Sequence, residues 1–259
     1  MMLLERNDSK FKIDYTSFPL INSVLNGSQE GKIFSENEIY FIFHKSGFSY
    51  LVENENVNYQ DIFNFFVYSK ELPPYFHIYD ANPELILASS KNSDHVTGRV
   101  RKRIQLNISK DPLAIDNTLP PGFSVSKIDA IGFEKLSVFN LSLGYKFWKS
   151  ERDFLENGFG FIINNENDLP VSICYSACLA NNIAEIDVAT LPEYQKKGLA
   201  KLVVSEFIRF CFNNGITANW DCFEDNLSSL NTARRLGFRD IFTYNFLSIF
   251  NKKGNHETF

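Results

Sequence analysis

A six-residue segment between a predicted strand and a predicted helix has the composition of an anion-binding turn. It reads Gln195-Lys196-Lys197-Gly198-Leu199-Ala200. Backbone N–H groups at the start of a helix lack helical partners and, with the helix dipole, attract an anion such as a pyrophosphate. Gly198 allows close approach to the backbone, and the two lysines add positive charge. The segment alone is equally compatible with an ordinary strand-turn-helix connection.

Other known arrangements for phosphate, metal or nucleotide chemistry do not occur in the sequence. There is no GxxxxGKS/T loop, and Gly158-Phe159-Gly160 lacks the third glycine of a dinucleotide fingerprint because Ile163 stands there. The cysteines form no CxxC pair and no metal-ligand spacing with histidine. They are Cys174, Cys178, Cys211 and Cys222. We therefore expect packed thiols, no metal, and neither a P-loop nor a Rossmann site.

The elements that must position this turn follow from hydrophobic periodicity. Residues 183–190 alternate like a strand, with Ile186, Val188 and Thr190 on one face and Glu185 and Asp187 on the other. The helix that follows the turn has an apolar stripe and ends at Asn214-Gly215. Further strands are predicted at 123–128, 158–163, 171–179, 216–222 and 238–250, and further helices at 133–148, 150–157 and from Asp225 or Asn226 to Gly237.

The chain divides near residues 108–122, where Pro112, Pro120, Pro121 and Gly122 interrupt any element. Before this boundary, residues 38–43 and 48–53 predict a hairpin, and residues 59–70 predict a helix. We therefore expect an α/β fold of α+β type with two domains. A smaller α/β half at 1–110 precedes a domain at 123–259, whose sheet is mixed, mostly antiparallel and flanked by helices.

Composition limits the class of protein. Of the 259 residues, 44% are hydrophobic and 22% charged, as in folded proteins, and 26 are Phe, which predicts aromatic packing. The net charge of -5 argues against a nucleic-acid partner. No apolar run of about 18 residues predicts a membrane span, and the start is too short for a signal peptide. With few cysteines, these features favour a cytoplasmic protein.

The turn resembles a known cofactor-binding motif once its context is included. Gln195-x-x-Gly198-x-Ala200 resembles the Q/R-x-x-G-x-G/A acetyl-CoA loop of the GNAT superfamily of N-acetyltransferases. The preceding residues 188–194 resemble the family's strand and proline turn. Downstream, Asn226-x-x-Ser229 followed by Leu236-Gly237-Phe238 resembles its second segment, Asn-x-x-Ala to Leu-Gly-Phe.

The resemblance covers about half of the chain, from residue 123 to 250. The two motifs together are fairly specific, whereas either alone is not. Phe-Trp-Lys-Ser at 147–150 and Trp220-Asp221-Cys222 also resemble a bacterial branch with an extra N-terminal half. The order of the predicted elements is similar to that of the family's sheet.

The resemblance implies a role for each matching position. The backbone of Val188 and Thr190 would pair with the pantetheine arm of acetyl-CoA, and Gln195 would shape the loop. Asn226 would contact pantetheine near the thioester, and Ser229 stands where the family usually has Ala. The amides that would hold the pyrophosphate belong to Lys196, Lys197, Gly198, Leu199 and Ala200.

The implied activity is acetyl transfer from acetyl-CoA to a small-molecule or peptide amine by direct attack on the thioester. In some family members a Glu on the strand that corresponds to residues 183–190 takes the amine's proton, which makes Glu185 the candidate base. The other interpretation of Glu185 is a solvated carboxylate on the strand with no catalytic role. Ala233 replaces the Tyr that commonly protonates the leaving thiolate, and Tyr244, Ser229 or a water are possible substitutes. Two alternatives stay open: a CoA-binding regulatory or scaffold module without turnover, and a protein that binds another acidic small molecule. The oligomeric state cannot be predicted.

Overall fold

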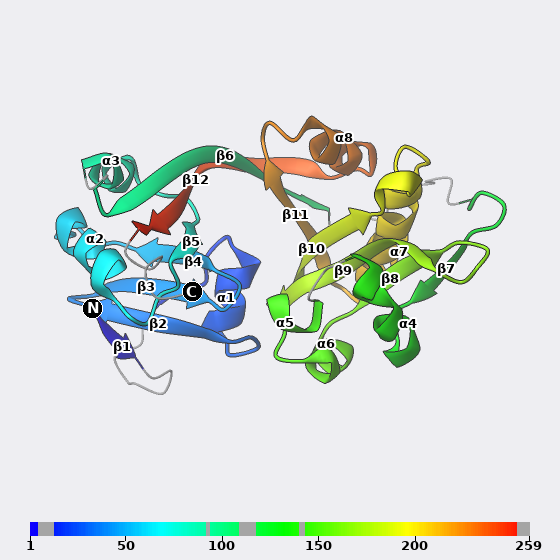
Figure 1. Cartoon of the computed structure of the whole chain (residues 1–259), viewed down its shortest axis with the longest axis horizontal. Coiled ribbons are helices and arrows are strands. Elements are labelled where there is room, and N and C mark those ends of the chain that lie inside the picture. Colours follow the sequence, from blue (N-terminus) through cyan, green and yellow to red (C-terminus); the bar gives the residue numbers. More distant parts are fainter. Residues whose placement is uncertain (5–12, 92–93, 109–117, 140–142, 253–259) are drawn as a thin grey trace. The chain divides into compact units, whose positions relative to one another are not determined.

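The computed structural model describes residues 1–4, 13–91, 94–108, 118–139 and 143–252, and it contains two compact units (Figure 1). The first unit comprises residues 1–103 and 243–259, and the second comprises residues 104–242. Strands β6 (Val96–Ile108) and β12 (Arg239–Asn251) each contribute residues to both units. The chain therefore leaves the first unit along β6 and returns to it along β12. The division expected from the sequence, a half at 1–110 and a domain at 123–259, stays a prediction.

The first unit contains a sheet with strand order β1-β2-β3-β4-β5-β12. Strands β4 and β5 pair in parallel, and the other neighbours in this order pair antiparallel. Its further elements are β1 (Met2–Leu4), α1 (Pro19–Leu25), β2 (Gly31–Glu36), β3 (Ile39–His44), β4 (Phe48–Val52), α2 (Tyr59–Tyr68), β5 (Tyr75–Ile78) and α3 (Pro83–Lys91). The expected hairpin is present as β3 and β4, with Tyr40 opposite Val52.

Aromatic side chains form the core of this unit, as the Phe content predicts. The apolar stripe of α2 buries Phe63 and Phe66 against the sheet. Phe41, Phe66 and Phe76 meet with ring centroids 5.0–5.9 Å apart. Such pairs add to the stabilisation that comes from burying their area. Helix α1, whose seven residues are all buried, packs on β3 and β4.

The second unit contains a sheet with strand order β6-β11-β10-β9-β8-β7. Strands β10 and β11 pair in parallel, whereas β10–β9, β9–β8 and β8–β7 pair antiparallel. Its further elements are β7 (Ser124–Lys127), α4 (Ala130–Glu134), a 3-10 helix (Lys135–Phe139), α5 (Leu143–Lys146), α6 (Glu151–Asn157), β8 (Gly160–Asn164), β9 (Pro170–Ala180), β10 (Ile183–Thr190), a 3-10 turn (Pro192–Tyr194), α7 (Leu199–Asn213), β11 (Thr217–Phe223) and α8 (Leu227–Arg235). The predicted mixed, mostly antiparallel α/β class is confirmed.

Helix α7 packs on β8, β9, β10 and β11 of this sheet. Its stripe, which includes Val203 and Phe207, shares one core cluster with Ile186 of β10 and with Trp220 of β11. A second group of aromatic side chains surrounds the buried Tyr175 of β9. It consists of Phe147, Trp148 and Phe154. Helix α7 therefore holds β10 and β11 from one face, and the two strands position the candidate site.

One predicted helix is not continuous. The sequence predicts a helix over 133–148, but the described part of this range contains the end of α4, the 3-10 helix and α5. Phe147 and Trp148 lie beyond α5 and are buried. Packing of these large side chains overrides weak helix propensity, because a short helix gains little without tertiary contacts. Among the described residues, no helix has both the length and the apolarity needed to cross a membrane.

Candidate functional site

Strands β10 and β11 separate halfway along their length. Their parallel register comprises Ile183–Thr217, Ala184–Ala218 and Glu185–Asn219. Strand β10 continues to Thr190 and β11 to Phe223. The residues of β10 beyond Glu185 stay paired with β9 on their other side, after a bulge between Glu185 and Ile186. The separation leaves an edge of β10 available to an extended ligand, which can pair with it as an added strand does.

The turn between β10 and α7 has an unusual backbone. Lys196 and Gly198 both adopt positive φ, +61° and +79°. Positive φ is costly for a lysine, and such residues are found preferentially at functional sites. The side chain of Gln195 fastens the turn, because its Nε2 donates to the backbone oxygen of Thr190 at 3.3 Å. Turns of this kind direct successive amides into one concavity that suits an anion.

Helix α7 starts without a side-chain cap. Gly198 occupies the N-cap position, and the first helical bond is donated by the Leu202 amide to the Gly198 oxygen at 3.2 Å. The amides before Leu202 therefore have no helical acceptor. A Cβ added to Gly198 would meet no atom within 4 Å. The glycine thus leaves space directly at the helix start, where the dipole favours negative charge.

A cleft of about 820 Å³ extends from this helix start between the separated strands. Of the predicted cofactor-binding residues, the structure brings nine to its surface: Val188, Thr190, Gln195, Lys196, Gly198, Leu199, Ala200, Asn226 and Ser229. Lys197 is not among the lining residues, and its ammonium lies 4.7 Å from the centre of the Tyr194 ring. The ten predicted cofactor-binding residues thus come from the end of β10, the turn, the start of α7 and the start of α8, and all but Lys197 line one cleft.

Sequence reasoning missed several residues that line the cleft. Lys201 and Arg235 join Lys196 there, and no carboxylate is among the described lining residues. The cleft therefore favours an anionic ligand. Lys201 follows the turn directly and could have been found from the helix periodicity, whereas Arg235 comes from the last turn of α8, for which no local signal exists.

Asn226 and Ser229 form the start of α8. The Asn226 side chain caps the helix by accepting from the Ser229 amide at 3.2 Å. Ser229 Oγ accepts from the indole nitrogen of Trp220 at 3.0 Å. Trp220 is 4% exposed and packs edge-on against Phe238, with ring centroids 5.4 Å apart. The Trp220–Ser229 pair therefore joins β11 to α8 on the surface of the cleft.

Glu185, the candidate base, occupies the last paired position of β10. It is only 7% exposed and is not among the residues that line the cleft. The Asn219 amide nitrogen lies 2.5 Å from its Oε2. Glu185 is thus held at the point where the strands separate, in a fixed orientation and largely out of water.

Asp187 lies two residues further along β10 and is more accessible, with 31% of its side chain exposed. Its Oδ2 accepts from the Tyr175 hydroxyl at 2.6 Å and from Lys146 Nζ at 3.1 Å. Burial, and then the charge of Asp187, raise the pKa of Tyr175 well above its usual value. Tyr175 therefore stays protonated and serves Asp187 as a donor.

The cysteines are buried thiols with no disulfide partner, as the sequence predicts. Burial raises the pKa of Cys174 and Cys178 well above the usual range and that of Cys211 to about 12. Such thiols stay protonated and unreactive. Within the part of the chain that the structure describes, no group of three or more His, Cys, Asp or Glu side chains is arranged to hold a metal ion.

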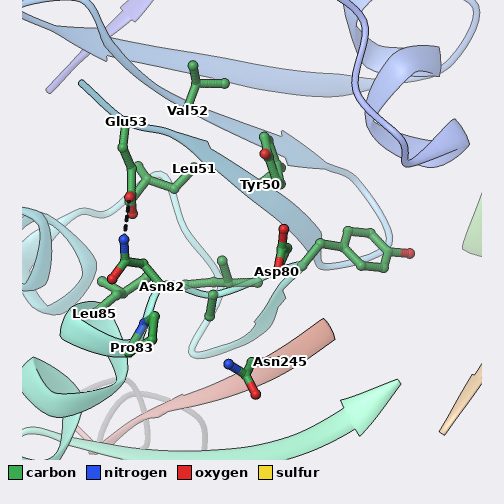
Figure 2. Close-up of a pocket in the computed structure, with 12 residues that line it drawn as sticks. Tyr50, Leu51, Val52, Glu53, Asp80, Asn82, Pro83, Leu85 and Asn245 are labelled. Carbon is green, nitrogen blue, oxygen red and sulfur yellow. Dashed lines mark hydrogen bonds between the residues drawn. The ribbon is translucent and has the colours of Figure 1, made fainter. Parts of the chain in front are cut away.

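The first unit contains a separate pocket of about 490 Å³, which is shown in Figure 2. Glu53 and Asp80 contribute carboxylates to it, and burial raises the pKa of both. Asn82 Nδ2 and the Tyr59 hydroxyl both donate to Glu53 Oε2, at 3.0 and 3.1 Å. This pocket is acidic where the cleft is basic, and it contains none of the residues that the sequence analysis selected.

Comparison with known proteins identifies the family. A profile of the GNAT acetyltransferase family matches residues 14–247. An uncharacterised N-acetyltransferase of Bacillus subtilis, YdfB, is 40% identical over 126 residues. This alignment covers 49% of the chain and 48% of YdfB, so the chain matches about half the length of that relative.

Solved structures show the same fold. A GCN5-related N-acetyltransferase-like protein from Streptococcus suis superposes with a TM-score of 0.67 at 20% identity, covering 93% of the chain and 94% of that protein. A GCN5-related N-acetyltransferase from Kribbella flavida gives a TM-score of 0.60 at 15% identity, covering 90% of the chain and 94% of that protein.

Proposed function

The chain belongs to the GNAT acetyltransferase family, and we propose that it transfers an acetyl group from acetyl-CoA to the amine of a small molecule or peptide. One observation carries the proposal: the uncapped start of α7, with its positive-φ turn, opens onto the same cleft as the exposed edge of β10. The cleft matches an elongated ligand with phosphates at one end and amides along its arm.

Acetyl-CoA fits this cleft in one direction. Its pyrophosphate binds the amides of residues 196–200 and the ammonium of Lys196. The pantetheine amides pair with the backbone of Val188 and Thr190, as an added strand would. Asn226 contacts the arm from α8. The thioester then lies toward Glu185 and Asn219, where β10 and β11 separate.

The reaction is a direct displacement. The amine nitrogen attacks the thioester carbonyl carbon, the C–S bond breaks, and CoA leaves as the thiolate. A backbone amide of β10 next to the thioester stabilises the carbonyl oxygen as charge develops. Glu185 receives the amine's proton, and Asn219 keeps its carboxylate in one orientation. Glu185 is the proposed base because it occupies the last paired position of β10, where the two strands separate.

A second candidate is a CoA-binding module without turnover. Two observations favour it: Glu185 is nearly enclosed, and Ala233 is fully buried and has no proton to donate. Thiol release separates the two proposals. An enzyme releases CoA faster when a suitable amine is added, whereas a binding module does not respond to any amine.

The first experiment is thermal unfolding with about 1 mM acetyl-CoA, CoA, ATP or NAD. A ligand at 100 times its Kd adds about 2.7 kcal/mol to the free energy of unfolding. We expect stabilisation by acetyl-CoA and CoA and none by NAD or ATP. Equal responses to all four ligands, or none, would refute the cleft assignment. Stabilisation by acetyl-CoA and CoA alone justifies a screen of amine acceptors. The cytoplasmic location of the protein stays a prediction.

A further inference from the structure

The two units arrange their central strands in the same way. In the first unit β4 pairs antiparallel with β3 and parallel with β5, and helix α2 connects β4 to β5. In the second unit β10 pairs antiparallel with β9 and parallel with β11, and helix α7 connects β10 to β11. A further helix, α3 or α8, follows in each unit. Strand β4 therefore corresponds to β10, and β5 to β11.

The pocket of the first unit lies where its two parallel strands separate. Their pairing comprises only Phe48–His77 and Ser49–Ile78, although β4 continues to Val52 in its pairing with β3. Residues 50–53 line the pocket from β4, residues between 78 and 85 line it from the connection of β5 to α3, and Asn245 lines it from β12. The pocket thus has the position in this unit that the cleft has in the other. Its volume of about 490 Å³ suits a small molecule.

The charges of this pocket are opposite to those of the cleft. No lysine, arginine or histidine is among the described residues that line it. The start of α2 also differs from that of α7. Asn58 caps α2 by accepting from the Gln60 amide at 3.0 Å, and Asp61 adds a negative charge in the first turn. The pocket is therefore unsuited to a second acetyl-CoA, and its charge favours a cation.

Glu53 and Asp80 are the carboxylates of the pocket, and no positive charge compensates them. The hydrogen bonds from Asn82 and Tyr59 both go to Glu53 Oε2, so Oε1 stays available to a ligand. Burial raises the pKa of Glu53, these hydrogen bonds oppose the shift, and the negative charges of Glu84 and Asp80 add to it. Burial alone raises the pKa of Asp80. A cationic ligand would relieve the cost of keeping these carboxylates charged and partly out of water.

We propose that this pocket binds an aliphatic amine in its ammonium form, held by Glu53 from the end of β4 and by Asp80 from the end of β5 (Figure 2). An ammonium group has three donors, which Glu53 Oε1 and the Asp80 oxygens can accept. The Tyr50 ring lines the same pocket, is fixed 5.5 Å from the Phe18 ring, and can contact the cation through its face. The inference does not depend on the proposed function.

An organic cation fits this pocket better than a metal ion does. Mg²⁺ and Ca²⁺ prefer about six or more oxygen ligands. In the part of the chain that the structure describes, no group of three or more Asp, Glu, His or Cys side chains is arranged to hold a metal ion. Two carboxylates from two different strands, in a space far larger than one ammonium group, favour a diamine.

The test is calorimetric titration of the full chain with cadaverine, a linear diamine. We expect a saturable site that the corresponding uncharged diol does not occupy. Glu53→Gln and Asp80→Asn should each weaken cadaverine binding about tenfold or more, because each removes a charged acceptor of an ammonium group. Glu55→Gln is the matched control, because it removes the same charge from an exposed residue that does not line the pocket. It should leave the affinity unchanged.

Thermal unfolding without ligand separates a binding role from a structural one. Asp80 has a positive φ of +46°, which Asn tolerates as well as Asp does. Asp80→Asn should therefore unfold at the same temperature as the wild type or higher, since it removes uncompensated charge. A clear loss of stability in Asp80→Asn would give the carboxylate a structural role and overturn the inference. No saturable binding of cadaverine to the wild type, equal affinities in the wild type and both pocket variants, or displacement of cadaverine by equimolar Ca²⁺ would overturn it as well.

Discussion

A pair of glycine substitutions separates ligand binding from backbone strain. Gly198 and Gly215 flank α7, and both have positive φ, +79° and +66°. At neither glycine would an added Cβ meet an atom within 4 Å. Alanine should therefore cost about 1–2 kcal/mol at each position, because an L residue is strained in this region. The two variants should lose similar stability without ligand.

Only Gly198 lines the cleft, so only Gly198→Ala should impair acetyl-CoA binding. Helix α7 has 15 residues, which places Gly215 about 22 Å from the cleft end. At 100 times its Kd, acetyl-CoA should stabilise the wild type and Gly215→Ala by about 2.7 kcal/mol. A methyl group in the path of the pyrophosphate should weaken binding at least tenfold, which removes nearly 1.4 kcal/mol of that gain.

The assay is urea unfolding of both variants and the wild type, with and without acetyl-CoA. The difference between the two conditions gives the ligand's contribution in each protein. Full ligand stabilisation of Gly198→Ala would refute the assignment of the helix start as the phosphate site. Equal loss in both variants would show that strain, and not blocked binding, is responsible.

Two further predictions concern proton binding. Glu185→Gln should bind acetyl-CoA normally but have a lower kcat than the wild type. The loss of kcat should be larger at lower pH, because more of the amine is then protonated. A kcat–pH profile identical to that of the wild type would exclude Glu185 as the base. His44 has a pKa lowered to about 3 by burial and then by Lys45, against 6.5 in the unfolded chain. The unfolded chain thus binds more protons between these values, so stability is complete above pH 6.5 and is lost as pH falls toward 3. Between pH 7 and pH 5, protonation of His44 in the unfolded chain lowers the free energy of unfolding by about 2 kcal/mol. Urea unfolding of His44→Gln should therefore show a weaker dependence of stability on pH. The same pH dependence in His44→Gln and the wild type would contradict the lowered pKa of His44.

The parts of the site that could be predicted are local in sequence. The alternation of residues 183–190, the glycine turn at Gly198 and the cap at Asn226 each depend on neighbours within a few positions. The structure contains each of these elements with nearly the expected bounds. Short-range periodicity and backbone preference therefore sufficed for these elements. The residues expected to line the cleft came instead from the resemblance of the turn and of the segment at Asn226 to the GNAT motifs.

The remaining features depend on distant pairings. Glu185 is oriented by Asn219, 34 residues away, and nothing near either residue indicates their contact. Arg235 reaches the cleft only because α8 crosses near the end of β11. Ile104 and Leu106, which precede the proline-rich segment, belong to the core of the second unit through contacts of the same kind.

The discontinuous first unit has a consequence for protein synthesis. Strand β5 pairs with β12, with Ile78 opposite Leu247, so this pairing waits for the last part of the chain. At about 5–20 residues per second, the ribosome needs roughly 10–30 s to add the intervening residues. Residues 104–242 emerge within that interval and can fold first. The N-terminal unit is therefore the last to be completed, and during translation its sheet lacks the β12 partner of β5, an edge that a chaperone could cover.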